Sequence, residues 1–237
     1  MRMKLDERHA VLLDPGLGPK LERPELLMSE IQRNADGGGV APHLHREHAD
    51  AFYVLEGDMD FHLAGETVRA SAGWLVISPQ GVVHGFGPGS ARMLNFHAPG
   101  TPYVGRGDTY DPPEGGGEGE AVVVAPGEGE RLIGQKRVAY IKAALPALTL
   151  SVFELEPGFE GPEPHQHDDH VDSFYVLEGD VEFVLGDEPV RAGPGTFFAA
   201  PPGIVHTFTN PGPDGARLLN MHSPDDGFAD FLRSQTN

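Results

Sequence analysis

The chain consists of short segments in which hydrophobic and polar residues alternate, separated by turns that contain glycine or proline. Val, Leu, Phe and Tyr dominate these segments, and a typical turn is expected at Glu56–Asp58. Alternation with a period of two is the pattern of a β-strand that buries one face. One helix is expected, at Asp226–Ser234, where Phe228, Phe231 and Leu232 recur at a spacing of three to four. The pattern predicts an all-β protein with a short C-terminal helix.

The sequence contains two copies of one unit. The segment FYVLEGD occurs at Phe52–Asp58 and again at Phe174–Asp180, an offset of 122 residues (174 minus 52). Upstream, Ala10–Gly18 resembles Ala121–Gly129 at an offset of 111, so we expect an insertion of 11 residues in the second copy, within Arg131–Ala144. Such a repeat indicates two domains of the same fold.

The expected domains are residues 1–100 and 121–237. Between them, residues 101–120 are rich in Gly, Pro and Glu and predict a linker or exposed loop. Short strands of this kind avoid exposed edges by closing into a barrel or a jelly roll. The sequence therefore predicts two tandem all-β barrels, the second carrying the C-terminal helix.

Charge and composition narrow the choice of partners. The chain has 17 Lys and Arg against 36 Asp and Glu, a formal net charge of −19, which disfavours nucleic acid and anionic membrane surfaces. It has no cysteine, which excludes disulfides and thiolate metal ligands. No apolar run reaches the ~18 residues of a membrane span. We expect a cytoplasmic protein, monomeric or homodimeric, that acts on a small molecule.

Ten of the twelve histidines form five pairs related by the repeat. In the first copy His43 and His45 are two residues apart, so on a strand both rings point to one face. Asp50 follows after a turn, and His84 lies on a later strand. Three imidazoles and a carboxylate that converge inside a barrel suit a divalent transition metal: Fe, Mn, Ni, Cu or Zn. With two copies, the chain would hold up to two metals.

Two motifs occur in each copy at the same spacing. The first copy reads His43-x-His45-x4-Asp50-x6-Gly57 and Gly73-x5-Pro79-x-Gly81-x2-His84. The second copy reads His165-x-His167-x4-Asp172-x6-Gly179 and Gly195-x5-Pro201-x-Gly203-x2-His206. These motifs resemble the two consensus motifs of the cupin superfamily, and the chain resembles bicupins such as the quercetin 2,3-dioxygenases and oxalate decarboxylases. The resemblance implies two double-stranded β-helix barrels, each able to hold a divalent metal.

The resemblance also implies the metal ligands, with one position left open. They would be the two histidines and the acid of the first motif and the histidine of the second: His43, His45, Asp50, His84, His165, His167, Asp172 and His206. The acid is Asp in both copies, whereas the family usually has Glu, and Asp is one methylene shorter. Asp50 and Asp172 are therefore weighed against His48 and His170, each two residues earlier, as the fourth ligands.

Two further histidines are candidates for acid/base catalysis. His97 and His222 alternate with Asn95 and Asn220 on the last strand of each copy, so Asn and His share one face. If that face is the barrel interior, these histidines lie beside the metal and can transfer a proton. The other interpretation is that they form hydrogen bonds with backbone groups at the mouth of the barrel.

The residues expected around the metal are apolar and aromatic, including Phe52, Phe86, Phe174 and Phe208. No arginine occupies the expected inward positions of the first motif, which disfavours a small dicarboxylate. By resemblance, the leading function is a dioxygenase that acts on a small aromatic or enolisable oxygenated substrate. The alternatives are a redox-neutral metal-dependent isomerase or decarboxylase, and a binding protein without catalytic activity.

Overall fold

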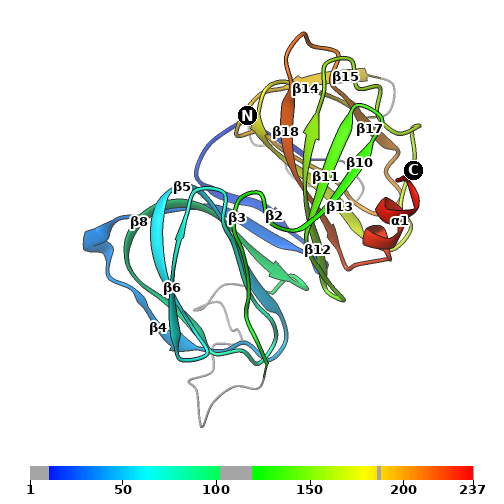
Figure 1. Cartoon of the computed structure of the whole chain (residues 1–237). Coiled ribbons are helices and arrows are strands. Elements are labelled where there is room, and N and C mark those ends of the chain that lie inside the picture. Colours follow the sequence, from blue (N-terminus) through cyan, green and yellow to red (C-terminus); the bar gives the residue numbers. More distant parts are fainter. Residues whose placement is uncertain (1–10, 102–118, 186–187, 237) are drawn as a thin grey trace. The chain divides into compact units, whose positions relative to one another are not determined.

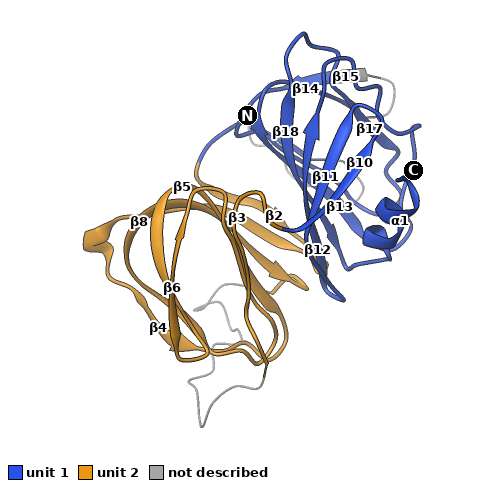
Figure 2. Cartoon of the chain, viewed as in Figure 1, with its two compact units in different colours: residues 1–16, 129–237 blue, residues 17–128 orange. Residues whose placement is uncertain are grey.

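The computed structural model describes residues 11–101, 119–185 and 188–236. The chain forms two compact units, shown in orange and blue in Figure 2. The first barrel comprises residues 17–128, and the second barrel comprises residues 1–16 and 129–237. Both are built from antiparallel strands, which confirms the all-β prediction (Figure 1). No helix in the described residues is long and apolar enough to span a membrane.

The first barrel contains eight strands and one 3-10 turn among the residues that the structure describes. They are β2 (Gly18–Glu22), β3 (Leu27–Arg33), η1 (Ala35–Gly37), β4 (Val40–His43), β5 (Ala49–Leu63), β6 (Glu66–Ser71), β7 (Leu75–Ser78), β8 (His84–Ala98) and β9 (Val122–Val124). The main sheet has the order β2-β3-β8-β5-β7-β9, while β4 pairs with β8 and β6 pairs with β5. The long strands β5 and β8 pair along their whole length and so contribute to both walls of the barrel.

Strand β5 continues through Glu56–Asp58, where the sequence pattern predicted a turn. The strand is bent there by β-bulges in its pairing with β8, between Val54 and Glu56 and between Met59 and Phe61. Gly57 has a φ of 72°, and a Cβ on it would lie 2.0 Å from the carbonyl oxygen of Ser90. Glycine is therefore required at this bend. The bend redirects β5 without ending it, so this one strand forms part of both walls of the barrel.

In the second barrel, the equivalents of the long strands β5 and β8 are each divided into two shorter strands. Its elements are β1 (Val11–Leu13), β10 (Glu130–Gly134), β11 (Arg137–Leu145), β12 (Leu148–Leu155), β13 (Val171–Glu178), β14 (Val181–Leu185), β15 (Glu188–Ala192), β16 (Phe197–Ala200), β17 (His206–Thr209), β18 (Ala216–Ser223) and α1 (Phe228–Ser234). The sheets have the orders β1-β16-β13-β18-β12-β11-β10 and β15-β14-β17. The range of the expected insertion, Arg131–Ala144, contains the turn to β11 and all of β10 except Glu130, and α1 confirms the expected helix, two residues shorter at its start.

The expected domain boundaries differ from the observed units because the two barrels exchange one short strand each. Val11–Leu13 pairs with β16 of the second barrel, and Val122–Val124 pairs with β7 of the first. These two segments are equivalent in the repeat, so each barrel offers the same edge to either of them. Residues 11–13 thus belong to the second barrel and residues 122–124 to the first. Most of the expected linker, residues 102–118, lies outside the described residues.

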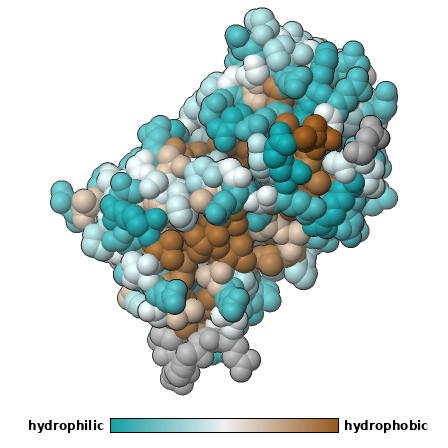
Figure 3. Space-filling model, viewed as in Figure 1, coloured by the Kyte–Doolittle hydropathy of each residue, from teal (hydrophilic) through white to brown (hydrophobic). Residues whose placement is uncertain are grey.

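Each barrel encloses its own hydrophobic core. Phe52, Phe61 and Phe86 are part of the first, and Phe153, Phe174 and Phe208 are part of the second. Alternation along the strands directs these rings inward, while charged residues occupy the outer face. On the face shown in Figure 3, hydrophobic residues gather mainly over the first barrel, and hydrophilic residues cover most of the rest.

Candidate metal centres

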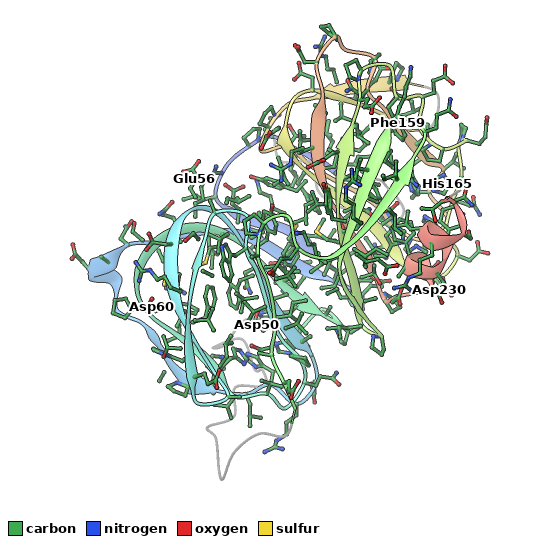
Figure 4. All side chains as sticks on the ribbon, viewed as in Figure 1. Asp50, Glu56, Asp60, Phe159, His165 and Asp230 are labelled. Atoms are coloured by element: carbon green, nitrogen blue, oxygen red, sulfur yellow. The ribbon has the colours of Figure 1, made fainter. Side chains whose placement is uncertain are left out.

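The four ligands expected in the first barrel come together. His43, His45, Asp50 and His84 are all buried, and each offers a ligand atom within 4.8 Å of the others. His43 ends β4, Asp50 is near the start of β5 and His84 begins β8, so three neighbouring strand ends build the cluster. His45 lies just beyond β4, not on a strand as expected, yet its ring centroid is 4.8 Å from that of His43. Figure 4 labels Asp50 inside this barrel.

Backbone carbonyls fix the orientation of two of these histidines. Nδ1 of His43 donates to the carbonyl oxygen of Ala41 at 2.9 Å, and Nδ1 of His84 donates to that of Val82 at 2.9 Å. The proton of a neutral ring then sits on Nδ1, which leaves a lone pair on Nε2. Burial lowers the pKa of His43 to about 4, so this ring is neutral at physiological pH. Both rings are thus prepared to bind a cation through Nε2.

Asp50 is ionised and held by an amide. Its Oδ1 accepts a hydrogen bond from Nδ2 of Asn95 at 2.5 Å, and its Oδ2 lies 3.3 Å from Nε2 of His84. Burial raises the pKa of Asp50, but His84 and the neighbouring histidines outweigh this effect and lower it to about 2. Burial likewise lowers the pKa of His84, and Asp50 raises it above its usual value. Without a metal, a proton on Nε2 of His84 can bridge to the carboxylate, and a divalent metal can take the place of that proton between the same two ligand atoms.

The second barrel repeats the arrangement with His165, His167, Asp172 and His206. Nδ1 of His165 and of His206 again donates to a backbone carbonyl, each at 2.9 Å. Oδ2 of Asp172 lies 3.1 Å from Nε2 of His206 and 3.7 Å from Nε2 of His167. The buried Nε2 of His167 makes no hydrogen bond among the described residues. The second cluster therefore offers the same nitrogen and oxygen donors as the first.

An amide also orients the second aspartate. Nδ2 of Asn220 donates to Oδ1 of Asp172 at 2.6 Å, and both residues are buried. Burial raises the pKa of Asp172, but His222, His167 and His206 lower it further, to a net value well below the usual range. The carboxylate is thus ionised and fixed before any metal binds. His165 and His167 lie outside the named strands, joined to β17 by a bridge between His165 and His206.

The alternative ligands His48 and His170 lie behind these clusters. The ring of His48 stacks on His45 at 4.1 Å and on His97 at 4.4 Å, and its Nδ1 forms a hydrogen bond with the Thr101 hydroxyl at 2.7 Å. In the second barrel Nε2 of His170 forms a hydrogen bond with Nδ1 of His222 at 2.9 Å. Each four-residue cluster contains the aspartate and not this histidine, while His170 also forms a separate candidate group with His167 and His222.

The two histidines expected in catalysis differ in their access to the cavities. His97 lines the cavity of the first barrel, and its Nε2 lies 3.7 Å from Oδ1 of Asp50. His222 lies 3.3 Å from Oδ1 of Asp172, but the ring of Phe228 stacks on it at 3.6 Å, and His222 is absent from the cavity lining. Both share a buried face with Asn95 and Asn220, which is the condition stated above for a role beside the metal. Of the two, His97 alone lines its cavity.

Each cluster opens into a cavity with aromatic walls. The cavity of the first barrel measures about 370 Å³ and is lined by Phe52 and Phe86. That of the second measures about 450 Å³ and is lined by Phe174 and Phe208, with four further aromatic or cationic residues: Arg137, Phe153, Phe228 and Phe231. Arg33 lines the first cavity and Arg137 the second, in addition to the positions of the motif, where the sequence has no arginine. Both arginines lie outside the motif positions considered.

Solved structures with the same fold cover most of the chain. A variant of salicylate 1,2-dioxygenase from Pseudoaminobacter salicylatoxidans in complex with gentisate is 16% identical with a TM-score of 0.66, covering 95% of this chain and 77% of that one. Oxalate decarboxylase from Bacillus subtilis, a protein with Mn(II) centres, is 14% identical with a TM-score of 0.62, covering 91% and 77%. At these identities the likeness shows the fold alone. No curated protein sequence matches the chain.

The sequence of each barrel matches a known domain family. The cupin domain family matches residues 31–97 in the first barrel and residues 151–222 in the second. Both matches contain all four residues of the respective cluster, and together they cover more than half of the 237 residues. The chain therefore belongs to the cupin family and is a bicupin, with one cupin domain in each barrel.

Proposed function

We propose that this bicupin is a metal-dependent dioxygenase that acts on a small aromatic or enolisable oxygenated substrate. The observation that carries the proposal is the position of each His3Asp cluster at an apolar, aromatic-lined cavity. A ligand in the cavity can thus reach the metal and contact the aromatic walls at once. The neighbours that act on salicylate or bind gentisate support a substrate of this kind.

His43, His45, Asp50 and His84 would hold one metal, and their repeat equivalents the other. A redox-active metal held there supplies a Lewis acid for an enolate or phenolate oxygen and access to chemistry with O2. The protein supplies the rest of the site. Asn95 and Asn220 fix the carboxylates, and the phenylalanines of the walls bind the body of the substrate and exclude water.

A redox-neutral isomerase or decarboxylase is the second candidate, favoured by His97. This histidine lines the first cavity and stacks on His48, and its Nδ1 lies 3.2 Å from the carbonyl oxygen of Thr101. A neutral ring whose Nδ1–H donates to that carbonyl presents Nε2 as a base towards the cavity. In the second barrel Phe228 covers the equivalent His222, so proton transfer of this kind would be confined to the first barrel.

Oxygen uptake tests the proposal directly. Protein reconstituted with each of Fe, Mn, Ni, Cu and Zn is given flavonols, catechols, gentisate and 1,3-diketones in an oxygen electrode, and products are identified by mass spectrometry. We expect uptake of one O2 per substrate consumed with a redox-active metal and none with Zn. The double variants His43→Ala/His45→Ala and His165→Ala/His167→Ala assign the activity to one barrel. His62→Ala, a histidine outside both clusters, is the matched control.

Two results decide between the candidates. If no substrate drives uptake with any metal, the dioxygenase proposal fails. If substrate is consumed without O2 and His97→Gln abolishes turnover while the metal is retained, the redox-neutral enzyme replaces it.

A further inference from the structure

Arg137 places a guanidinium in the cavity of the second barrel. It is the first residue of β11, at the end of the hairpin that the first barrel lacks. Ala139 and Ile141, two and four residues later, are in the core, so alternation directs Arg137 to the same inner side. Arg137 lines the cavity together with His165 and Asp172 of the metal cluster. The cation and the metal ligands thus share one cavity.

This guanidinium has no anionic partner among the described residues. Its Nε is buried and makes no hydrogen bond, and its Cζ lies 5.5 Å from the ring centroid of Phe153. Burial lowers the pKa of Arg137, and no carboxylate offsets this effect. Burying a cation without a counter-ion is unfavourable. Such a cation is a binding site for an anion that arrives with the ligand.

The two carboxylates of the cavity wall, besides that of Asp172, do not pair with this cation. Oδ2 of Asp226 lies 3.1 Å from Nδ1 of the buried His170. Glu163 is exposed, and its carbonyl oxygen accepts the hydrogen bond from His165. The net charge of the chain is −19, so anions are repelled from its surface in general. An anion-binding site therefore has to be local, and the half-buried guanidinium of Arg137 meets this requirement.

The first barrel also has an arginine at its cavity, but on a different strand. Arg33 at the end of β3 lines the first cavity, and its Cζ lies 5.1 Å from the ring centroid of Phe86. Its repeat equivalent in the second barrel is Leu155, which is the cross-strand partner of Arg137. An arginine over an aromatic ring thus occurs at the same level of both barrels. Where the first barrel has Arg33, the second has Leu155, and Arg137 on the neighbouring strand provides the guanidinium instead.

We propose that the second barrel binds the carboxylate of an amphipathic organic acid through Arg137. The apolar body of the acid would lie along Phe153, Phe174 and Phe208, and an oxygen at its other end would reach the His165 cluster. This inference rests on the proposed function only where it places that oxygen at the metal cluster. The carboxylate site itself needs no metal. The substrate class is an aryl or alkyl carboxylate whose second oxygen is separated from the carboxylate by an apolar spacer.

The test compares acids with their neutral amides. Isothermal titration calorimetry on the full chain loaded with Zn(II) measures binding of 4-hydroxybenzoate, 4-hydroxyphenylacetate and 3-(4-hydroxyphenyl)propionate, each beside its amide. We expect Arg137→Met to weaken binding of the best acid by roughly 10- to 100-fold, the range of a hydrogen-bonded charge pair. Arg131→Met removes the same charge from an exposed position of the same hairpin and should leave binding unchanged. Arg33→Met is the matched change in the first barrel.

Three results would overturn the proposal: unchanged acid binding by Arg137→Met, amides that bind wild-type protein as tightly as the acids, or no acid that binds in the millimolar range. The titration is repeated on protein stripped of metal with EDTA. Binding that depends on Arg137 there supports the carboxylate site even if oxygen uptake fails, so the two proposals are tested apart. Arg137→Met should also keep or raise the melting temperature, because it removes a half-buried cation that has no counter-ion. A structural role would lower it.

Discussion

Replacement of Asn220 by leucine removes the amide that orients Asp172. The two side chains have the same branching and the same number of heavy atoms, leucine being the larger, and Asn220 is fully buried, so the change removes hydrogen bonds without leaving a cavity. The main loss is the 2.6 Å bond from Nδ2 to Oδ1 of the carboxylate. We expect weaker metal binding in the second barrel, because the carboxylate then has to be ordered by the metal itself.

The magnitude follows from the charge of the acceptor. A buried hydrogen bond to a charged group contributes about 1.5 to 3 kcal/mol. If the metal has to restore this order, the dissociation constant rises roughly 10- to 100-fold, at about 1.4 kcal/mol per factor of ten. Asn220 also accepts from the Ser151 hydroxyl and donates to the carbonyl of Ser173, both at 3.3 Å. Losing these weaker bonds affects the metal-free and metal-bound states alike, so it changes stability more than affinity.

The assay isolates one site. Asn220→Leu is made in a His43→Ala/His45→Ala background, and Zn(II) affinity is measured by competition with a fluorescent chelator. Asn95→Leu in a His165→Ala/His167→Ala background is the matched control for the first barrel, where the equivalent bond is 2.5 Å long. If Asn220→Leu keeps its near-ultraviolet circular dichroism spectrum and binds Zn(II) as tightly as its background, the aspartate is not an oriented ligand.

Four further predictions follow from the same geometry. Asp50→Asn should lower metal content by about one metal per chain, and His48→Gln should leave it unchanged, as measured by inductively coupled plasma mass spectrometry. In metal-free protein the pKa values of His48 and His222 fall from 6.5 to about 3, chiefly through burial. The unfolded chain then binds more protons below pH 6.5, so urea titrations should show about 2 kcal/mol less stability per histidine at pH 5 than at pH 7. Phe228→Ala should reduce the free energy of unfolding by about 1 to 3 kcal/mol in urea, since it removes the ring stacked on His222. Metal addition at saturating concentration should raise the melting temperature in proportion to affinity, as measured by differential scanning calorimetry.

The fold and the clusters were predictable because the chain repeats itself. An offset of 122 residues carries His43 onto His165 and Asp50 onto Asp172, and residues equivalent in a repeat occupy equivalent places in the two barrels. The sequence could not assign Val11–Leu13 and Val122–Val124 to their barrels. Three-residue strands with the same pattern fit the same edge, so nothing local distinguishes one partner from the other.

Arg137 escaped prediction for the opposite reason. It lies within Arg131–Ala144, the range of the expected insertion, where the repeat offers no equivalent position for comparison. The available signal was its alternation with Ala139 and Ile141, which directs it inward. A cation at an inward position of a strand contradicts the usual pattern of a core, and such contradictions are expected at functional sites.

The residues around the clusters differ more between the barrels than the clusters do. Thr101 in the first barrel corresponds to Asp226 in the second, at the offset of 125 that relates His97 to His222. The Thr101 hydroxyl forms a hydrogen bond with His48, whereas the Asp226 carboxylate lies 3.1 Å from His170. The first-barrel histidine thus contacts a neutral hydroxyl, whereas its equivalent in the second barrel contacts a carboxylate. Because nearby charge tunes a metal and its ligands, the two candidate sites are chemically distinct, and an activity assay has to be made with one cluster removed in order to report on the other.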